Sequence, residues 1–503
     1  MKRIIAIIVV LLVIVVLAVP YLVGMRVENR FMEWVATANQ EVQSQWGDQS
    51  SIKVVEYQRG WLSSRAKVAA ELRLEKPNEP PHTFAFTNSV TIEHGPLPGI
   101  LNGEHGEGWA WLHSQAKATE VLAALATLDE DPQELEQLRK ALASYPPVEL
   151  QMRLAFDGTS DWSVHAGPYR IADLECCSQM SWSPLIMQGQ AAADFAASRG
   201  TLTLDRVQIE GRDDNSQLVV EGFSADFDTE RHVSGLDLGK VKWTLRKLTL
   251  HSEQGRLQIA GLSIGADSEA NGESLDNHIS VQLKSADGIG PDGAPHTFSG
   301  NWGLSLNGLD LAATAKFVKV VQAMNGEAPD PTAEAKLQQL VTAMAKQSLK
   351  HDPKLSIAPL SLTLDGQKVT GDLELGLTEA GSSDLIAHPE EIVRYLQGRA
   401  HLSVPETLAL SAVETFERRQ IEQASLEREL NATTEGQQTP QAEPDPEQAK
   451  AMARQVSRQL IAGLVGQGLI RREGADLVTE VELEPGGKLT VNGKPMAVPL
   501  LGQ

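Results

Sequence analysis

The distribution of hydrophobic and polar positions separates an uncharged N-terminal run from a long body of shorter segments. Residues 4–24 contain no charged side chain and one proline, Pro20. A helix of this length is about 30 Å long, which matches the hydrocarbon core of a bilayer. The run exceeds the apolar core of a cleaved signal peptide. We therefore predict that residues 1–29 form an uncleaved signal-anchor helix that crosses the membrane once.

The segment that follows the run mixes helical and strand patterns. Apolar side chains recur at helical spacing from Val27 to Trp46, whereas Ala66–Leu74 alternates with the period of two expected for a strand. Residues 117–145 are again helical in pattern. These patterns predict a membrane-proximal α+β region over residues 30–147.

Residues 148–311 form a ladder of alternating segments, with an internal echo. Leu202–Ile209 and Trp243–Leu250 share one pattern, in which the alternation slips by one residue and then resumes. A β-bulge produces such a slip. We predict a repetitive antiparallel β region. The echo indicates stacked hairpins, although any antiparallel sheet generates similar echoes.

The C-terminal third alternates helices, strands and a polar linker. Residues 355–378 predict a hairpin that turns at Asp365-Gly366, and Pro405 marks the start of a helix. The predicted regions are mixed helix and strand over 312–430, a flexible linker over 431–445, and a helix with strands over 446–503. The predicted fold class is α+β: one N-terminal transmembrane helix, then an extended, mostly antiparallel β-rich exported body with helical insertions.

The charge distribution favours export of the body. The chain has a net charge of −22, and its first thirty residues carry four basic side chains and one acidic one, so the remainder is at −25. Basic residues are equally numerous on the two sides of the run, and the positive-inside rule does not decide the orientation. The very short N-terminal tail and the acidic body favour placing residues 30–503 outside the cytoplasm. An acidic body repels phosphate backbones, which excludes nucleic acid as a partner.

The sequence contains no recognisable catalytic or metal-binding constellation. Cys176 and Cys177 are adjacent, which excludes a disulfide framework and leaves either a strained vicinal disulfide or two thiols. The twelve histidines show no metal-binding spacing, and no nucleophile elbow or phosphate-binding loop is present. We predict no catalytic, cofactor or metal site, and we lean against an enzyme.

Three short segments resemble the markers of YdgA-like proteins, a family of bacterial envelope proteins with a domain of unknown function. They are a tyrosine–x–arginine–glycine–aromatic segment, a His-Gly-Pro turn and a closing Asn-Gly segment. Their residues are Tyr57, Arg59, Gly60, Trp61, His94, Gly95, Pro96, Asn492 and Gly493. The resemblance spans nearly the whole chain and implies an inner-membrane protein with a periplasmic body. It implies no activity.

Two interpretations of the first marker remain open. Arg59, Gly60 and Trp61 together form a recognition patch, because arginine pairs with carboxylate or phosphate and tryptophan offers a large contact surface. Alternatively, they form a structural bulge with Trp61 buried and Arg59 in an ion pair. His94 is interpreted as a turn histidine that bonds to backbone.

Three functions are compatible with this sequence. The first is a non-enzymatic scaffold or envelope-assembly and maintenance factor, the second a carrier or shield for lipid in a β-lined groove, and the third a hydrolase with an unrecognised site. A continuous row of apolar side chains along an unfilled groove favours the carrier, whereas a filled core favours the scaffold. The expected partners are the membrane, through the N-terminal helix, other envelope proteins or lipid, and a second copy of the chain through helices at 405–430 and 446–470.

Overall fold

The computed structural model describes most of the chain. The described residues are 2–46, 50–74, 82–95, 98, 108–117, 140, 143, 145–172, 177–194, 196–212, 215–253, 255–289, 293–324, 331–377, 395–416 and 446–496. They fall into two compact units, and each is described by itself. The first unit comprises Met1–Asn277 with Leu309–Gln347, and the second comprises His278–Gly308 with Ser348–Gln503.

The first unit begins with one long helix, α1 (Lys2–Trp46), which contains Pro20. The predicted anchor and the predicted helix from Val27 to Trp46 are therefore parts of a single helix. The side chains of residues 1–19, which make up most of the predicted anchor, lie outside the described residues. No helix in the described part of the chain is both long enough and apolar enough to cross a membrane.

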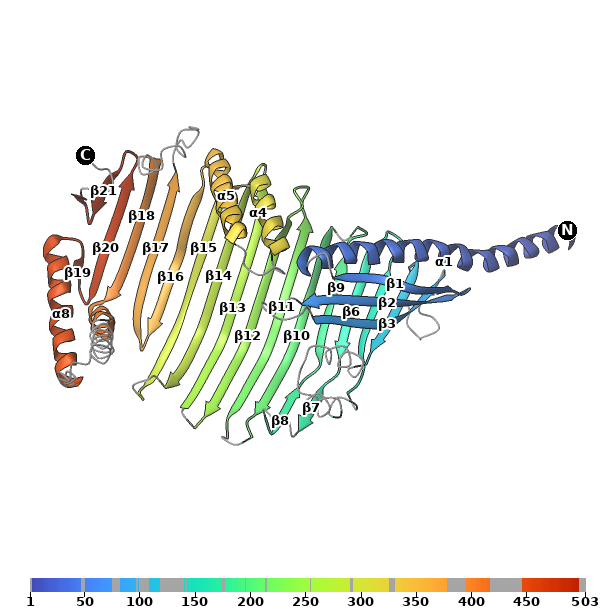
Figure 1. Ribbon diagram of the computed structural model, residues 1–503, viewed down its shortest axis with the longest axis horizontal. Helices are drawn as coiled ribbons and strands as arrows, with labels where there is room; N and C mark the ends of the chain where they lie inside the picture. Colours follow the sequence, from blue (N-terminus) through green and yellow to red (C-terminus); the bar gives the residue numbers. More distant parts are fainter. Residues whose placement is uncertain are drawn as a thin grey trace. The chain divides into compact units, whose positions relative to one another are not determined.

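The first unit is built on a long antiparallel sheet, drawn from blue to green in Figure 1. Its strands pair in the order β1–β2–β3–β4–β5–β6–β9–β10–β11–β12–β13, and the β7–β8 hairpin joins through β8 on β10. The bounds are β1 Ser51–Arg59, β2 Ser63–Leu74, β3 His82–His94, β4 Ala110–Ala116, β5 Val148–Leu154, β6 Ser160–Ala166, β7 Tyr169–Ala172, β8 Gln179–Trp182, β9 Leu185–Ala191, β10 Ala197–Glu210, β11 Gln217–Arg231, β12 Asp237–Ser252 and β13 Gly255–Asn271. The predicted β-rich, antiparallel character is confirmed.

The phase slip in β10 to β13 has a different origin from the predicted bulge. The pairing omits Asp205 opposite Gly222, and Arg246 opposite Gly261, while the register is the same on both sides of each omission. A bulge adds a residue to one strand only and shifts the register. Here one residue of each paired strand is left out of the pairing, so the register does not shift. Gly222 and Gly261 each adopt a positive φ of 63°. Such a backbone angle is readily adopted by glycine and strained for other residues.

The main core of the first unit lies between α1 and the first strands of the sheet. Val23, Val27 and Phe31 lie four residues apart on one helix face and pack against Ile92 and Leu112. A second, smaller core surrounds helix α4 (Leu311–Met324) and is followed by helix α5 (Pro331–Ser348). These helices confirm the helical pattern predicted after residue 312.

The second unit is a smaller antiparallel sheet with a C-terminal helix. Its strands pair in the order β15–β16–β17–β18–β20–β21–β22, with β19 beside β20. The bounds are β14 Ser274–Ile289, which spans the division between the units, β15 Pro295–Asp310, β16 Lys354–Leu364, β17 Gln367–Leu377, β18 Leu396–Pro405, α8 Pro446–Gln467, β19 Arg471–Glu473, β20 Asp476–Glu484, β21 Lys488–Val491 and β22 Lys494–Met496, and a short 3-10 turn occupies Leu349–His351.

Two local predictions in the second unit have different outcomes. The hairpin turn at Asp365-Gly366 is confirmed, with φ values of 48° and 77°. Pro405 is the last residue of β18 and does not open the following helix, which covers residues 406–416. The predicted linker, 431–445, lies outside the described residues.

Candidate functional site

The register of the first sheet gathers apolar side chains into rows on one face. One row runs across β5, β6 and β9 to β13, because each of its members is paired with the next. Its members are Leu150, Val164, Met187, Leu202, Ala225, Trp243 and Ile264. Successive side chains of a strand point to opposite faces. The residues on either side of each member therefore belong to the opposite face.

A second row lies beside the first and contains two aromatic rings. It consists of Met152, Trp162, Gly189, Gly200, Phe227, Val241 and Ala266. The Trp162 and Phe227 rings are nearly parallel, with an interplanar angle of 14° and centroids 6.3 Å apart. A Cβ at Gly189 would lie 2.6 Å from Trp162 Cζ2, and one at Gly200 would lie 2.7 Å from Phe227 Cζ. Glycine is therefore needed in the space that the rings occupy.

The degree of coverage changes along this face, which we call the apolar face. Near α1 it is fully covered, since Ile92 and Ala110 are 0% exposed. Farther along, Leu150 is 38% exposed and Trp243 is 45% exposed. A side chain that follows the apolar pattern and stays this exposed indicates a face that is not filled by the chain's own core.

The second unit repeats this pattern. One of its rows consists of Leu304, Ile357, Leu373, Ala400, Val481 and Val491, and its neighbour consists of Leu306, Leu355, Leu375, Gly398, Leu483 and Leu489. Leu306 is 37% exposed. On the intervening positions Glu374 pairs with Lys354 and, at 2.9 Å, with Arg399. Apolar and polar or charged side chains thus alternate along each strand.

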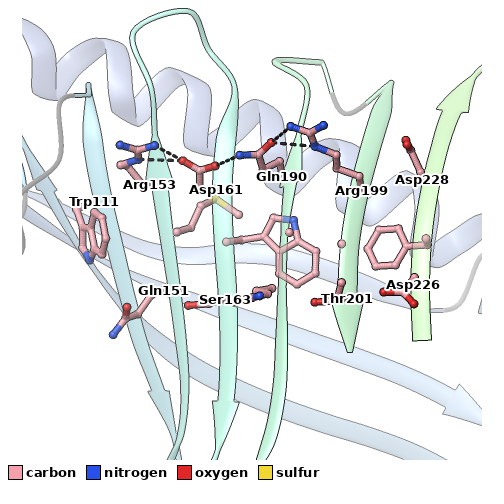
Figure 2. Close-up of a pocket in the computed structure, with 16 residues that line it drawn as sticks. Trp111, Gln151, Arg153, Asp161, Ser163, Gln190, Arg199, Thr201, Asp226 and Asp228 are labelled. Atoms are coloured by element: carbon pink, nitrogen blue, oxygen red, sulfur yellow. Dashed lines mark hydrogen bonds and ion pairs between the residues drawn. The ribbon is translucent and has the colours of Figure 1, made fainter. Parts of the chain in front are cut away.

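The opposite face of the first sheet carries a polar groove, shown in Figure 2. Arg153 donates to Asp161 at 3.0 Å, Gln190 donates to Asp161 at 2.7 Å, and Arg199 donates to Gln190 at 3.0 Å. The groove has a volume of about 650 Å³. Its other labelled residues are Trp111, Gln151, Ser163, Thr201, Asp226 and Asp228. Arg153, Asp161, Gln190 and Arg199 thus bond to one another in a chain, and residues of the second apolar row, among them Trp162 and Phe227, also line the groove.

The first sequence marker attaches α1 to the sheet. Tyr57 is one of the residues packed against the core under the helix. Arg59 lies 3.5 Å from Glu28 of α1, and its guanidinium carbon is 5.1 Å from the centre of the Tyr21 ring. The predicted structural ion pair is thus present. The predicted burial of Trp61 is wrong, since this side chain is 46% exposed.

The second marker contacts the same helix. His94 is 2% exposed, and its Nε2 atom is 3.0 Å from the hydroxyl of Ser64. Its ring thus bonds to the Ser64 side chain, and a hydrogen bond to the backbone of Pro20 accompanies this contact, as predicted for a histidine that bonds to backbone. A Cβ on Gly24 would lie 2.6 Å from His94 Cε1, so the ring fits against α1 only where the helix has glycine.

The electrostatics of this junction keep both aromatic groups neutral. Burial lowers the pKa of His94 below its usual value, the Pro20 backbone opposes this shift, and the charge of Arg59 adds to it. Burial raises the pKa of Tyr57, with a smaller opposing contribution from the hydroxyl of Ser64. Both pKa shifts favour the neutral form of the side chain. The junction is therefore best described as a structural attachment.

The remaining marker residues occupy turns. Gly60 closes the β1–β2 turn, where a Cβ would lie 2.2 Å from the carbonyl oxygen of Ser63. Gly95 has a φ of 136°, and Pro96 lies outside the described residues. Asn492 and Gly493 belong to the second unit and form the β21–β22 turn. Asn492 accepts a hydrogen bond from the backbone of Glu480 at 2.9 Å and donates one to the Gly468 carbonyl at 3.0 Å.

Sequence reasoning missed the helix side of the junction. Tyr21, Gly24 and Glu28 contact marker residues, and the available signal was the four-residue spacing of Val23, Val27 and Phe31, which marks a helix face that packs on something. Cys177 is buried, whereas Cys176 lies outside the described residues. The redox state of the pair stays a prediction.

Metal chemistry receives no support from the described residues. Within them, no group of three or more histidine, cysteine, aspartate or glutamate side chains is placed to hold a metal ion. The junction and the polar groove offer hydrogen bonds and ion pairs, and the apolar face offers contact area. The face is the feature of the first unit with the clearest capacity to bind another molecule.

Comparison with known proteins places the chain in a family. No curated protein and no solved structure gives a significant match. A family model described as a bacterial protein of unknown function, DUF945, matches residues 1–499. This match covers α1 and nearly all of both units. The chain therefore belongs to the DUF945 family of bacterial proteins of unknown function.

Proposed function

We propose that this protein is a membrane-anchored carrier or shield for lipid acyl chains, and that the apolar face of β5 to β13 is its binding surface. The observation that carries the proposal is the incomplete coverage of that face. Its rows are continuous across the strands, yet Leu150 and Trp243 keep 38% and 45% of their surface exposed. Apolar rows that stay only partly buried over so many strands are uncommon on proteins that bind nothing.

The chemistry of the face suits an extended hydrocarbon chain. The rows contain aliphatic and aromatic side chains. The polar residues that alternate with them along each strand point to the other face. Each methylene group removed from water contributes about 0.8 kcal/mol. Covering about ten methylenes would therefore contribute about 8 kcal/mol, before the cost of ordering the chain is subtracted. No directional bond to the ligand is required.

The location is part of the same proposal. We place the N-terminal run in the bacterial inner membrane as a single span and the acidic body in the periplasm. The uncharged residues 4–24, the net charge of −22 and the resemblance to YdgA-like proteins support this placement. The apolar face begins beneath α1, where Val27 and Phe31 contact Leu112. A lipid leaving the membrane would meet the exposed part of the face just beyond this cover.

The competing functions make different demands on the same surface. A scaffold or assembly factor needs no lipid on the apolar face and would use the body to contact other envelope proteins. A hydrolase needs a nucleophile and a base that converge in an accessible cleft, whereas the Ser64–His94 pair of the junction is buried, with 1% and 2% of its two side chains exposed. The predicted self-association through residues 405–470 stays a prediction, and sedimentation of the full chain in detergent would test it.

The test measures lipid that remains with the full chain after purification. Lipids are extracted from the washed protein and quantified by mass spectrometry, for the natural sequence and for Trp243→Glu. The matched control is Lys242→Glu, which places the same carboxylate on the adjacent residue and therefore on the opposite face. We expect retained phospholipid to fall severalfold for Trp243→Glu and to stay unchanged for Lys242→Glu. Equal lipid in all three proteins, or none in any, would leave the scaffold as the better account.

A further inference from the structure

We propose that the body of this protein also rests on the membrane surface, through a rim formed by Tyr21, Leu22, Trp61 and Leu62. This inference rests on the proposed anchor, but it does not depend on lipid binding at the apolar face. The partner is the headgroup region of a phospholipid bilayer. In this arrangement the β1–β2 turn and α1 together fix the orientation of the sheet relative to the bilayer.

The rim combines two segments that are distant in sequence. The Leu62 side chain and Pro20 of α1 flank the same glycine, since a Cβ on Gly95 would lie 3.8 Å from Leu62 Cδ2 and 3.9 Å from Pro20 Cβ. Arg59 bridges the segments from the side, because its guanidinium lies over the Tyr21 ring and beside Glu28. The β1–β2 turn is therefore held against the helix at the point where the uncharged run ends.

All four rim side chains remain exposed although they are large and apolar or aromatic. The exposed fractions are 47% for Tyr21, 56% for Leu22, 46% for Trp61 and 37% for Leu62. The core under α1 lies directly beside them, with Val23 at 8% and Val27 at 3%. The same stretch of helix thus turns one face into the protein and leaves a second apolar face outside.

The composition of the rim suits a bilayer interface. Tryptophan and tyrosine gather at the level of the headgroups, where an apolar ring and a polar tip are both solvated. Arginine extends its charge toward phosphate while its stem stays among apolar groups. Arg59 is the arginine beside this rim, and its guanidinium carbon lies 5.1 Å from the centre of the Tyr21 ring.

The position of the rim along the chain indicates that it faces the membrane. Tyr21 and Leu22 lie near the C-terminal end of the uncharged run, residues 4–24. At about 1.5 Å per residue, the run from Ile4 to Pro20 spans roughly 25 Å, so Tyr21 falls near the far boundary of the hydrocarbon core. The Trp61–Leu62 turn lies at the same level because it is held against Pro20. A rim at this depth faces headgroups in the proposed topology.

The experiment measures the depth of a fluorescent label on the full chain in vesicles. Single cysteines replace Trp61 or Val233 in a background with Cys176→Ser and Cys177→Ser, and each is labelled with NBD. Val233 is the matched control, because it is 98% exposed in the β11–β12 turn. The proteins are reconstituted in vesicles of phosphatidylcholine and phosphatidylglycerol that contain a nitroxide-headgroup lipid. Quenching is expected to be roughly threefold stronger at position 61 than at position 233.

Two further readouts separate the ways in which the experiment can fail. Leu62→Cys is labelled in parallel, so that a folding defect caused by loss of Trp61 does not decide the outcome. Carbonate extraction of the same vesicles reports whether the N-terminal helix is inserted. Resistance to carbonate with equal quenching at 61, 62 and 233 overturns the rim alone. Release by carbonate overturns the anchor and the rim together, and it leaves the lipid-retention test of the apolar face as a separate measurement.

Discussion

The two halves of the apolar face in the first unit share one sequence pattern and differ in what covers them. In the half beneath α1, side chains such as Ile92 and Ala110 are completely buried. In the half on β9 to β13, the rows continue in register, yet Trp243 is 45% exposed. Alternation therefore defines which face of a strand is apolar, whereas a separate element decides whether that face becomes a core. Under the proposed function, the covered half stabilises the fold and the other half binds the ligand.

The largest difference between the halves is expected in the free energy of unfolding. Ile92→Ala should cost about 2–5 kcal/mol, because it leaves a cavity in a closed core. Leu202→Ala on the uncovered half should cost about 1 kcal/mol, since its side chain is only partly removed from water. Thermal unfolding of the full chain in detergent measures both. Equal losses would mean that the two halves are equally well packed.

The fit between α1 and the sheet gives the next largest effect. Gly24→Ala should destabilise the covered half by about 1–3 kcal/mol, because the new methyl group would lie 2.6 Å from His94 Cε1. His94→Ala removes that obstacle, so the double variant should recover part of the loss. Strictly additive losses in the same thermal measurement would show that the ring does not pack on Gly24.

A smaller effect is expected where Arg59 fastens the helix. Its side chain is 31% exposed, and that of Glu28 is 27% exposed, so solvent screens their ion pair. Arg59→Gln removes both this ion pair and the contact with the Tyr21 ring, so it should lower the free energy of unfolding by about 1 kcal/mol. Protection of α1 against limited proteolysis is a sensitive measure of this loss. Glu28→Gln should reproduce most of it, and an unchanged cleavage rate for both variants would remove Arg59 from the attachment.

The smallest expected effect is a dependence of stability on pH. The pKa of His94 is lowered in the fold mainly by burial, so the unfolded chain binds a proton first as the pH falls. The contribution of His94 is therefore fully present above its unfolded pKa of about 6.5 and is lost as the pH falls below it. This loss of stability is measured as the change in the unfolding midpoint between pH 7.5 and pH 5, a range that includes the unfolded-state pKa of about 6.5. His94→Gln should flatten the dependence, and an identical slope in that variant would contradict the assignment.

Part of this arrangement follows from the sequence and part does not. The alternation of Leu202–Ile209 and Trp243–Leu250 predicts strands with one apolar face, and the Asp365-Gly366 pair predicts its hairpin, because both are short-range properties. The packing of α1 on β1 to β5 is a long-range choice that periodicity leaves open. The exposure of Trp61 depends on that choice, since the turn that carries it is held at the end of the uncharged run.

The cause of the change in alternation along β10 to β13 could not be predicted from the sequence either. A change of phase in one strand is compatible with a bulge, and only the partner strand shows that Gly222 and Gly261 drop out together with their neighbours. The candidate site was likewise only partly predictable. Apolar rows were foreseen as the mark of a carrier, but whether they were filled depended on the position of the helices.

The most direct test of the account places a photo-crosslinking amino acid at Leu202 or at Thr201 in the full chain within bacterial envelopes. These adjacent positions on β10 lie in the apolar row and in the polar groove, respectively. We predict that irradiation links phospholipid to the protein labelled at position 202 and not to the protein labelled at 201. Equal crosslinking of lipid at both positions, or crosslinking only to proteins, would contradict the claim that the uncovered half of the apolar face binds lipid.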